Sequence, residues 1–435
     1  MRFVIEPAAL HGGEISVPGD KSISHRALMF AGIADGRSHI TGFLEGEDCL
    51  ATLAALRALG VRIDRDGAAI VVYGTGREGL AEAQDPLDMG NSGTAMRLFT
   101  GLLAGQRFSS RLFGDPSLTR RPMGRVIGPL ELMGARIASE AGYPPLRIAG
   151  GQSLKAIRYV MPVASAQVKS AILLAGLYAR GETTVTEPAV TRDHTERLLQ
   201  SMGVDVRCRD GSISIEGGQS LRATDFDVPA DLSSAAFPVL ATLISRDGES
   251  MIKGVGVNPT RTGFIDILRQ MGALIELRSE RWLGREPVAD LRVRASGLRG
   301  IDVDPAMVSL AIDEFPVLFI AAAFADGTTR FSGLAELRVK ESDRISAMSA
   351  GLKALGITVT ETPDGAIVQG GRMSGGTVDS FGDHRIAMSF AVAATAASAA
   401  VEVRNTAAVD TSFPGFVECL RSVGARINLL KEDSA

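Results

Sequence analysis

Hydrophobic and polar positions follow one pattern that returns along the whole chain. Leu and Met recur at helical spacing, a glycine follows, and a run of Val and Ile begins, as in LAALRALGVRI and RLLQSMGVDV. Apolar residues at i, i+3 and i+4 predict an amphipathic helix, the glycine suits the left-handed residue that ends a helix, and the β-branched run predicts a strand. The glycine occurs six times, at Gly60, Gly134, Gly203, Gly272, Gly356 and Gly424.

A second kind of helix is predicted equally often, and it is apolar on nearly every side. A helix that is apolar all round must be buried. Each copy opens with Ser, Asn or Asp, which are favoured as N-cap residues. The six stretches are SISHRALMFAGIA, NSGTAMRLFTGLLAG, SAQVKSAILLAGLYA, DLSSAAFPVLATLI, DEFPVLFIAAAFA and DHRIAMSFAVAATA.

Together these patterns predict an α/β (α+β) fold of six units, each with one buried helix, one amphipathic helix and strands between them. A chain of 435 residues exceeds one ordinary core, so we expect two domains of three units. The near-identical strings VPGD (17–20) and VPAD (228–231) are interpreted as the two crossings between domains, because proline fixes φ and glycine permits turns. This assigns residues 19–230 to an inserted domain and residues 1–18 plus 231–435 to a discontinuous one.

Composition excludes several classes of function. With 46 Lys and Arg against 50 Asp and Glu, the net charge is −4, so neither a nucleic-acid nor a membrane partner is expected. Cys49, Cys208 and Cys419 are far apart and form no CxxC, which argues against a metal site or disulfides and favours a reducing compartment. The N-terminus lacks the apolar run of a signal peptide, so we expect a cytoplasmic protein. Residues 386–401 predict a buried helix, since they are too short and too rich in small residues for a membrane span.

Cations gather where the buried helices begin. A helix N-terminus carries unpaired N–H groups and a partial positive charge, and it therefore binds anions. If these helix ends converge, they form a cleft for a polyanion between the domains. The cations near helix starts are Lys21, Arg26, Arg97, Lys169 and Arg385, and two further clusters, TRRPMGR and RVKESDR, lie outside the buried helices.

Each of these strings also has a plain structural interpretation. GDKS resembles the end of a Walker loop, but the preceding glycines are missing, so a nucleotide loop is not expected. GNSGT fits a simple helix cap. RVKESDR fits a solvated face with Glu341 and Arg344 paired at i, i+3. Asp313 and Glu314 fit N-terminal capping of an apolar helix. His384, between two charged residues at the start of a buried helix, is hardest to explain this way, because burying charge costs several kcal/mol unless it is paired or liganded.

Taken in order, eight strings resemble the 5-enolpyruvylshikimate-3-phosphate (EPSP) synthase family across essentially the whole chain. They are PGDKSISHR, GNSGTAMR, RRPM, SAQVK, IDE, RVKESDR, DHRIAM and TSFP. The forms SAQVK, RDHTE and NPTR are similar to the second bacterial class of that family. The resemblance implies a two-domain inside-out α/β barrel, the enolpyruvyl transferase fold, with six βαβαββ repeats, three per domain, and an active site in the cleft between the domains.

The resemblance also implies the reaction, in which the enolpyruvyl group of phosphoenolpyruvate moves to the 5-hydroxyl of shikimate 3-phosphate through a tetrahedral intermediate and phosphate leaves. It implies that Asp313 accepts the hydroxyl proton and that Glu341, helped by Lys21, protonates the methylene carbon and later takes that proton back. No metal or organic cofactor is implied, and a monomer is expected. The implied contacts to shikimate 3-phosphate are Lys21, Ser22, Arg26, Ser165, Gln167, Arg192, Asp313 and Lys340. Those to phosphoenolpyruvate are Lys21, Gly93, Arg121, Gln167, Arg344 and Arg385.

The sequence departs from the family at one position and leaves two rivals open. Some relatives carry lysine before TFP in the last motif, where this chain has Thr411, so one phosphoenolpyruvate-binding cation is missing there. Gly93 implies sensitivity to glyphosate, because tolerant relatives carry alanine at this place.

The sister enzyme that uses UDP-N-acetylglucosamine is one rival, although it usually has a cysteine in the loop GDPSLTRRPMGR and none is present. A non-catalytic repeat protein that binds an anion is the other.

Overall fold

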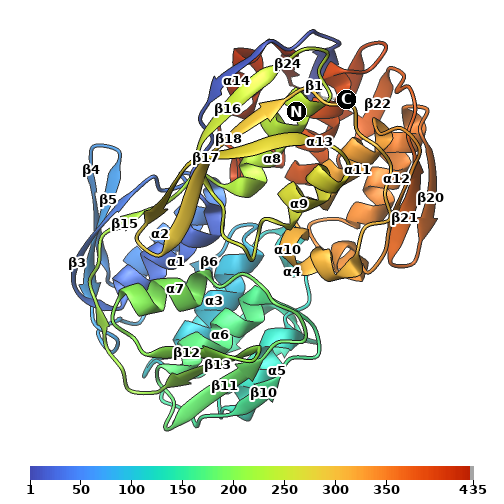
Figure 1. Cartoon of the computed structure of the whole chain (residues 1–435). Helices are drawn as coiled ribbons and strands as arrows, with labels where there is room; N and C mark the ends of the chain where they lie inside the picture. The colour runs from blue at the N-terminus through green and yellow to red at the C-terminus, as the bar shows by residue number, and fades with distance from the viewer. Residues whose placement is uncertain (432–435) are drawn as a thin grey trace. The chain divides into compact units, whose positions relative to one another are not determined.

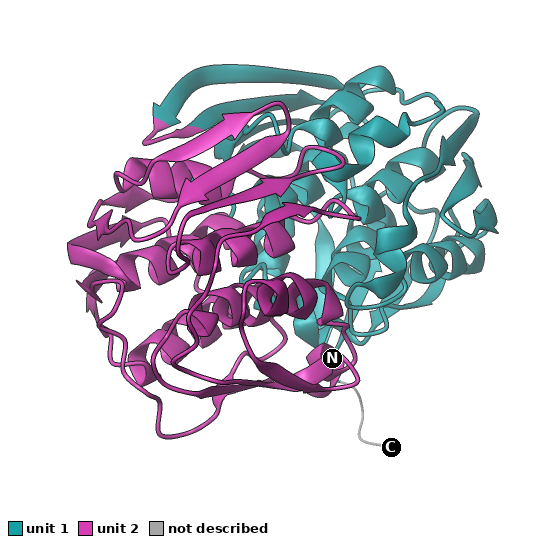
Figure 2. Cartoon of the chain, turned by 90° about the horizontal axis from the view of Figure 1, so that it is seen from below, with its two compact units in different colours: residues 1–18, 229–282, 287–435 teal, residues 19–228, 283–286 magenta. Residues whose placement is uncertain are grey.

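The computed structural model describes residues 1–431 and divides them into two compact units (Figure 2). Unit 1 holds residues 1–18 and 229–282 and the chain from 287 onward. Unit 2 holds residues 19–228 together with 283–286, the turn of a hairpin. The sequence placed the second boundary at 230/231, whereas the contacts place it at 228/229, inside the second VPxD string.

Unit 2 contains three sheets and, inside them, three buried helices (Figure 1). The sheets have the orders β14-β3-β5-β4 with β15 beside β3, β6-β7-β9-β8, and β10-β11-β13-β12. The helices are α1 Lys21–Gly32, α2 Glu47–Ala58, α3 Gly93–Ala104, α4 Pro116–Thr119, α5 Gly124–Leu132, α6 Ala166–Gly176 and α7 His194–Ser201. The strands are β3 Ala34–Thr41, β4 Arg62–Asp66, β5 Ala69–Thr75, β6 Leu87–Asp88, β7 Ser110–Phe113, β8 Ile137–Glu140, β9 Tyr143–Ile148, β10 Arg158–Val160, β11 Glu182–Thr186, β12 Val206–Arg209, β13 Ser212–Glu216, β14 Leu221–Arg222 and β15 Phe226–Asp227.

Unit 1 repeats this construction within its described residues. Its sheets have the orders β17-β18-β16-β2, β19-β21-β20 and β22-β23-β1-β24. Its helices are α8 Leu232–Leu243, α9 Gly263–Gln270, α10 Val308–Ala311, α11 Phe315–Ala323, α12 Arg344–Ala354, α13 His384–Thr395 and α14 Phe416–Ser422, with 3₁₀ turns η1 Pro305–Met307, η2 Ala335–Val339 and η3 Thr406–Thr411. The strands are β1 Arg2–Glu6, β2 Gly12–Ile15, β16 Glu249–Gly256, β17 Leu274–Leu283, β18 Glu286–Arg294, β19 Thr328–Phe331, β20 Thr358–Thr362, β21 Gly365–Gln369, β22 Gly376–Asp379, β23 Val401–Arg404 and β24 Arg426–Leu430.

The repeated glycine does what the sequence predicts at all six places. Gly60, for example, has φ 88° and follows α2, and Gly272 has φ 98° and follows α9. The other four also have positive φ, between 84° and 104°. A strand begins two or three residues after each glycine. Since this region of φ is strained for side chains with a Cβ, glycine ends the helix and turns the chain into the sheet.

The six helices predicted to be buried are α1, α3, α6, α8, α11 and α13, and each is buried along most of its length. They form the centre of each unit's core, with α3 against α6 in unit 2 and α13 against α8 and α11 in unit 1. Residues 386–395 are part of buried α13, as predicted, but residues 396–401 are not helical, because α13 ends at Thr395 and β23 begins at Val401.

Each unit therefore confirms the predicted mixture of α and β elements. Five of the sheets combine parallel with antiparallel pairing of strands. Parallel pairing requires a crossover, which the helices supply. In the sheet β19-β21-β20 the parallel partner is reduced to isolated bridges, such as Asp302 with Arg330.

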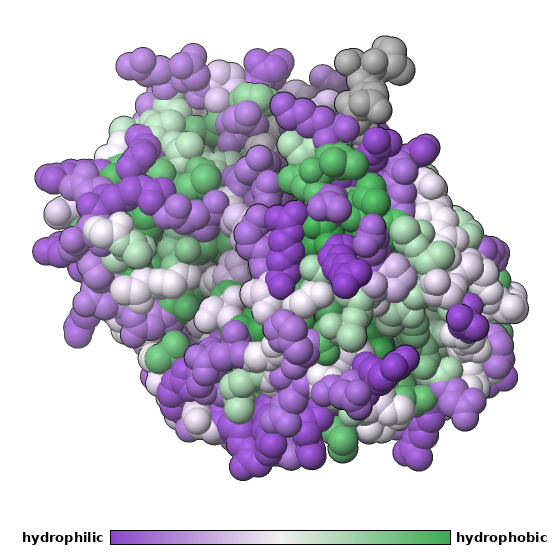
Figure 3. Space-filling model, turned by 90° about the horizontal axis from the view of Figure 1, so that it is seen from above, coloured by the Kyte–Doolittle hydropathy of each residue, from purple (hydrophilic) through white to green (hydrophobic). Residues whose placement is uncertain are grey.

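Among the described residues, no helix has both the length and the apolar character needed to cross a membrane. On the face drawn in Figure 3, hydrophobic residues appear in separate groups between hydrophilic ones.

Candidate active site

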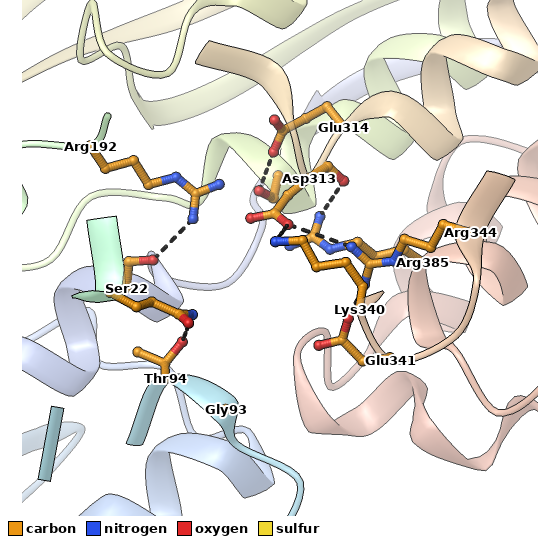
Figure 4. Close-up of polar contacts among 12 residues, drawn as sticks. Ser22, Gly93, Thr94, Arg192, Asp313, Glu314, Lys340, Glu341, Arg344 and Arg385 are labelled. Carbon is orange, nitrogen blue, oxygen red and sulfur yellow. Dashed lines mark hydrogen bonds and ion pairs between the residues drawn. The ribbon is translucent and has the colours of Figure 1, made fainter. Parts of the chain in front are cut away.

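The first turn of α1 carries two of the predicted site residues of unit 2. Asp20 is the N-cap, and its carboxylate accepts a hydrogen bond from the Ile23 N–H at 2.8 Å. Lys21 forms a short ion pair with Asp48 of α2. Ser22 Oγ lies 3.4 Å from a guanidinium nitrogen of Arg192, as Figure 4 shows. The cap thus holds a lysine and a hydroxyl at the positive end of a helix.

Arg26, one turn further along α1, is 2% exposed and held by neutral oxygens. Its guanidinium donates to Thr195 Oγ1 and Ser170 Oγ, both at 2.8 Å, and to the Ser22 carbonyl at 2.9 Å. Burial lowers the pKa of Arg26 to about 10, so it stays protonated at neutral pH. A buried cation held mainly by hydroxyl groups is well suited to bind a phosphate.

The start of α3 brings together further predicted residues of unit 2. Gln167, in the first turn of α6, donates to Thr94 Oγ1 at 2.8 Å and accepts from Arg97 at 2.8 Å. A Cβ on Gly93, the first residue of α3, would lie 2.8 Å from a nitrogen of Arg97 and 3.2 Å from one of Arg121. Glycine therefore leaves these two guanidinium groups the room that a methyl group would take.

Arg121 follows α4 and is itself buried. It donates to Asn91 Oδ1 at 2.5 Å and lies 3.3 Å from Ser117 Oγ. Ser165 is the N-cap of α6 and accepts from the Val168 N–H at 3.4 Å. The structure therefore groups Arg121 with Gly93, and Ser165 with Gln167 at the start of α6.

Lys169 corrects one expectation from the sequence. Its position at the start of α6 suggested an anion-binding cation, but its side chain is 1% exposed and pairs with Glu196 at 2.7 Å and Glu187 at 3.0 Å. Although burial lowers the pKa of Lys169, the two carboxylates outweigh burial and raise it. Lys169 is therefore a structural cation behind Arg26. Arg26 donates to Ser170, which follows Lys169 in the chain, and to Thr195, which precedes Glu196.

In unit 1 the predicted residues gather around Asp313, as the close-up in Figure 4 shows. Its carboxylate lies 3.7 Å from Lys340 Nζ and 3.5 Å from Arg344. Its carbonyl oxygen accepts a hydrogen bond from Arg385 at 3.0 Å. Two cations of one short segment, Lys340 and Arg344, and a third from the start of α13, Arg385, thus contact one aspartate.

Arg344 connects Asp313 to Glu341. It is 1% exposed, donates to Glu341 at 2.6 Å, and donates through Nε to Asp383 at 2.8 Å. Burial acts to lower the pKa of Arg344, but Asp383, Glu341 and Asp313 outweigh it and raise that pKa. For Asp383, burial acts to raise the pKa, while Arg344 outweighs it and lowers the pKa below 3.8. The arginine is therefore a permanent cation between carboxylates.

Two other predicted features have structural explanations. Arg338 of RVKESDR pairs with Asp343 at 2.7 Å and with Glu361 at 2.9 Å, and it thus braces the segment that carries Lys340. Thr411 is buried and donates to the carbonyl of Ala408, so it does not replace the missing lysine.

Sequence reasoning missed the partners that hold the site residues in place. Asp48 pairs with Lys21, and it did not stand out in the sequence. Asn91 accepts from Arg121, whereas the sequence suggested only a helix cap for it. The ion pair of Lys169 with Glu196 joins α6 to α7, which no local pattern signals. Asp383 did carry a signal, as part of the charged triplet that opens a buried helix.

Comparison with known proteins identifies the family of the chain. The family model described as EPSP synthase (3-phosphoshikimate 1-carboxyvinyltransferase) matches residues 5–420. The chain is 57% identical over 431 residues to a 3-phosphoshikimate 1-carboxyvinyltransferase of Methylococcus capsulatus, with 98% of each chain covered. It is 53% identical to one of Legionella pneumophila (strain Lens), with 96% of each covered.

Solved structures give the same result for the fold. An EPSP synthase structure from Acinetobacter baumannii has a TM-score of 0.88 and 50% identity, and the match covers 98% of this chain and 100% of that one. A second structure from the same organism also has a TM-score of 0.88, at 48% identity. Since the family match spans nearly the whole chain and more than half of the residues are identical to those of curated relatives, the chain belongs to the EPSP synthase family.

Proposed function

We propose that this member of the EPSP synthase family transfers the enolpyruvyl group of phosphoenolpyruvate to the 5-hydroxyl of shikimate 3-phosphate and releases phosphate, as a step of aromatic biosynthesis. The observation that carries the assignment of residues is the group around Asp313, where two carboxylates, Asp313 and Glu341, share one buried arginine, Arg344. Addition and elimination need a base for the alcohol and an acid for the methylene carbon. This group holds two candidates for those roles.

Unit 2 is proposed to supply most of the anion binding. Ser22, Arg26, Ser165, Gln167 and Arg192 hold shikimate 3-phosphate in this assignment. The buried Arg26 is held rigidly by three neutral oxygens, so its orientation is set before substrate arrives. Preorganised donors of this kind lower the cost of binding a phosphate.

The second anion is assigned to residues from both units. Lys21, Gly93, Arg121 and Gln167 of unit 2 bind phosphoenolpyruvate, together with Arg344 and Arg385 of unit 1. The closeness of Arg97 and Arg121 to Gly93 supports the assignment of the unit 2 residues. This assignment needs the two units to close on the same pair of substrates, which would exclude water and strengthen every ionic contact.

In the chemical step Asp313 accepts the proton of the 5-hydroxyl while the hydroxyl oxygen bonds to C2 of phosphoenolpyruvate. Glu341, with Lys21, delivers a proton to C3, which gives the tetrahedral intermediate. Loss of that C3 proton to Glu341 then re-forms the double bond as the C–O bond to phosphate breaks. Lys340 completes the shikimate 3-phosphate contacts, and its Nζ lies 3.7 Å from the Asp313 carboxylate.

Asp313→Ala tests this assignment. We expect the variant to lose more than about 100-fold in turnover, because one general base is worth 10² to 10⁴. The measurement is phosphate release from phosphoenolpyruvate, with and without shikimate 3-phosphate. Asp302→Ala, which removes an exposed aspartate paired with Arg330, is the matched control and keeps full turnover.

Near-normal turnover in Asp313→Ala would remove Asp313 from the base role. Phosphate release that depends on UDP-N-acetylglucosamine in place of shikimate 3-phosphate would support the sister reaction. Binding of both substrates without any release would support the non-catalytic alternative. We further propose a cytoplasmic monomer, since a reducing compartment would keep Cys49, Cys208 and Cys419 as thiols.

A further inference from the structure

Asp313 is followed by a second carboxylate that points to other partners. Figure 4 shows the side chain of Glu314 turned away from Lys340, whereas Asp313 lies against it. Glu314 is 1% exposed. A carboxylate buried this deeply is costly unless it is paired and hydrogen-bonded.

The partners of Glu314 come from the starts of α8 and α9. Ser233 donates a short hydrogen bond to Glu314. Arg261 lies 3.6 Å from the Glu314 carboxylate, and it donates to Ser233 Oγ at 2.6 Å and to Asp231 at 3.2 Å. Asp231 is the N-cap of α8. The Glu314 carboxylate therefore binds one buried arginine and one hydroxyl at the positive end of a buried helix.

The backbone transmits this anchoring to Asp313. The Glu314 N–H donates to the Ala311 carbonyl at 2.9 Å, and the Glu314 carbonyl accepts from the Leu318 N–H at 3.0 Å. The Asp313 carbonyl is held by Arg385 at 3.0 Å. Asp313 thus sits between two fixed points: Arg385 holds its carbonyl, and Glu314 holds the next residue.

We infer that Glu314 is a positioning residue for catalysis, whose contacts with Ser233 and Arg261 orient the Asp313 carboxylate for proton transfer. This rests on the proposed role of Asp313 as base. Glu314 touches neither substrate in this assignment; it acts through its neighbour. Misplacing a reacting group by 1 Å can reduce the rate by about 10²-fold, so the orientation of Asp313 has a measurable value.

The experiment compares Glu314→Ala with Glu314→Gln. Glutamine keeps the shape and one acceptor oxygen for Ser233, so it should restore much of what alanine loses. We expect kcat to fall about 30-fold in Glu314→Ala and less than about 5-fold in Glu314→Gln, with KM for both substrates nearly unchanged.

Asp290→Ala is the matched control for general loss of stability. Asp290 is also a buried carboxylate of unit 1, paired with Lys253 at 2.6 Å and accepting from Gly254 N–H at 2.8 Å. We expect this variant to lose thermal stability comparably and to keep kcat within about twofold, because it is absent from the Asp313 group.

The double variant Asp313→Ala with Glu314→Ala separates this inference from the proposed function. If Glu314 acts only through Asp313, the double variant is no slower than Asp313→Ala alone. Losses that multiply, or full kcat in Glu314→Ala, would overturn the positioning role. Full activity in Asp313→Ala would instead overturn the role of Asp313 itself, whatever Glu314 does.

Discussion

The helices α1 and α8 begin with nearly the same sequence, VPGDKS and VPADLS, yet their first turns have different surroundings. Both use an aspartate cap: Asp20 accepts from Ile23 N–H and Asp231 from Ser233 N–H, each at 2.8 Å. At α1 the following residues are half-buried and bear a lysine. At α8 the corresponding leucine and serine are fully buried.

The comparison shows that the same aspartate cap can begin a helix with a structural role and a helix with a proposed binding role. At α8 the chain supplies its own anion, since Glu314 and its partner Arg261 close the first turn. At α1 the corresponding serine, Ser22, lies near Arg192, and Arg26 takes the place of the apolar Phe237. The α8 turn is therefore a sealed structural copy of the arrangement that we propose α1 offers to a substrate anion.

The strongest test makes the first turn of α1 resemble that of α8. Lys21→Leu should lower kcat/KM by about 10³-fold, because it removes both a substrate contact and the proposed partner of Glu341. The measurement is steady-state turnover with both substrates varied. Asp48 would then be a buried carboxylate without this lysine, so Lys21→Leu with Asp48→Asn is the matched control and should lose the same activity. Retention of a tenth of the activity would mean that the α1 turn is not a substrate site.

The reverse exchange should affect stability rather than chemistry. Leu232 is 1% exposed, so Leu232→Lys would bury a cation and lower the free energy of unfolding by about 3 kcal/mol. Urea unfolding measures this loss, with Leu232→Met as the control of similar volume. A loss below about 1 kcal/mol would show that the α8 turn is open to water like α1.

The fold was largely predictable because its signals are local. A glycine at each amphipathic helix end and a continuous apolar run in each buried helix need only a short window of sequence. The grouping of candidate site residues was predictable where they form one string, as Lys340, Glu341 and Arg344 do. Partners were not, because Arg26 and Thr195 lie 169 residues apart and hydroxyl groups carry no periodic signal. The prediction that Lys169 binds an anion was wrong for the same reason, since only the fold brings Glu187 and Glu196 to it.

A smaller effect is expected from the one residue that differs within the VPxD strings. A Cβ on Gly19 would lie 1.8 Å from the Gly42 carbonyl oxygen, so Gly19→Ala forces the backbones apart. We expect it to lower the free energy of unfolding by about 2 kcal/mol. Ala230→Gly, the reciprocal change, should cost no more than about 1 kcal/mol through added flexibility of the unfolded chain. Equal losses in the two variants would contradict the close approach at Gly19.

The smallest effect concerns His25, whose counterpart in α8 is Ala236. His25 is fully buried, with Nδ1 2.7 Å from Thr52 Oγ1 and Nε2 3.4 Å from Ser92 Oγ. Burial, with Lys21 and Arg26 nearby, holds the pKa of His25 well below 6.5. The unfolded chain therefore takes up this proton first as the pH falls. Stability that is fully present above pH 6.5 is lost progressively below it.

Between pH 6.5 and 5.5 His25 should contribute a loss of about 1 kcal/mol in the free energy of unfolding. Urea unfolding at a series of pH values measures the slope, and His25→Asn should flatten it by that amount because asparagine does not titrate. Thr52→Val is the control: it removes the Nδ1 partner and lowers stability at every pH, but it keeps the imidazole and hence the slope. Equal slopes in the wild type and His25→Asn would mean that the buried imidazole keeps its ordinary pKa. In that case His25 would not make the stability of α1 depend on pH, and α1 would not differ from α8 in this respect.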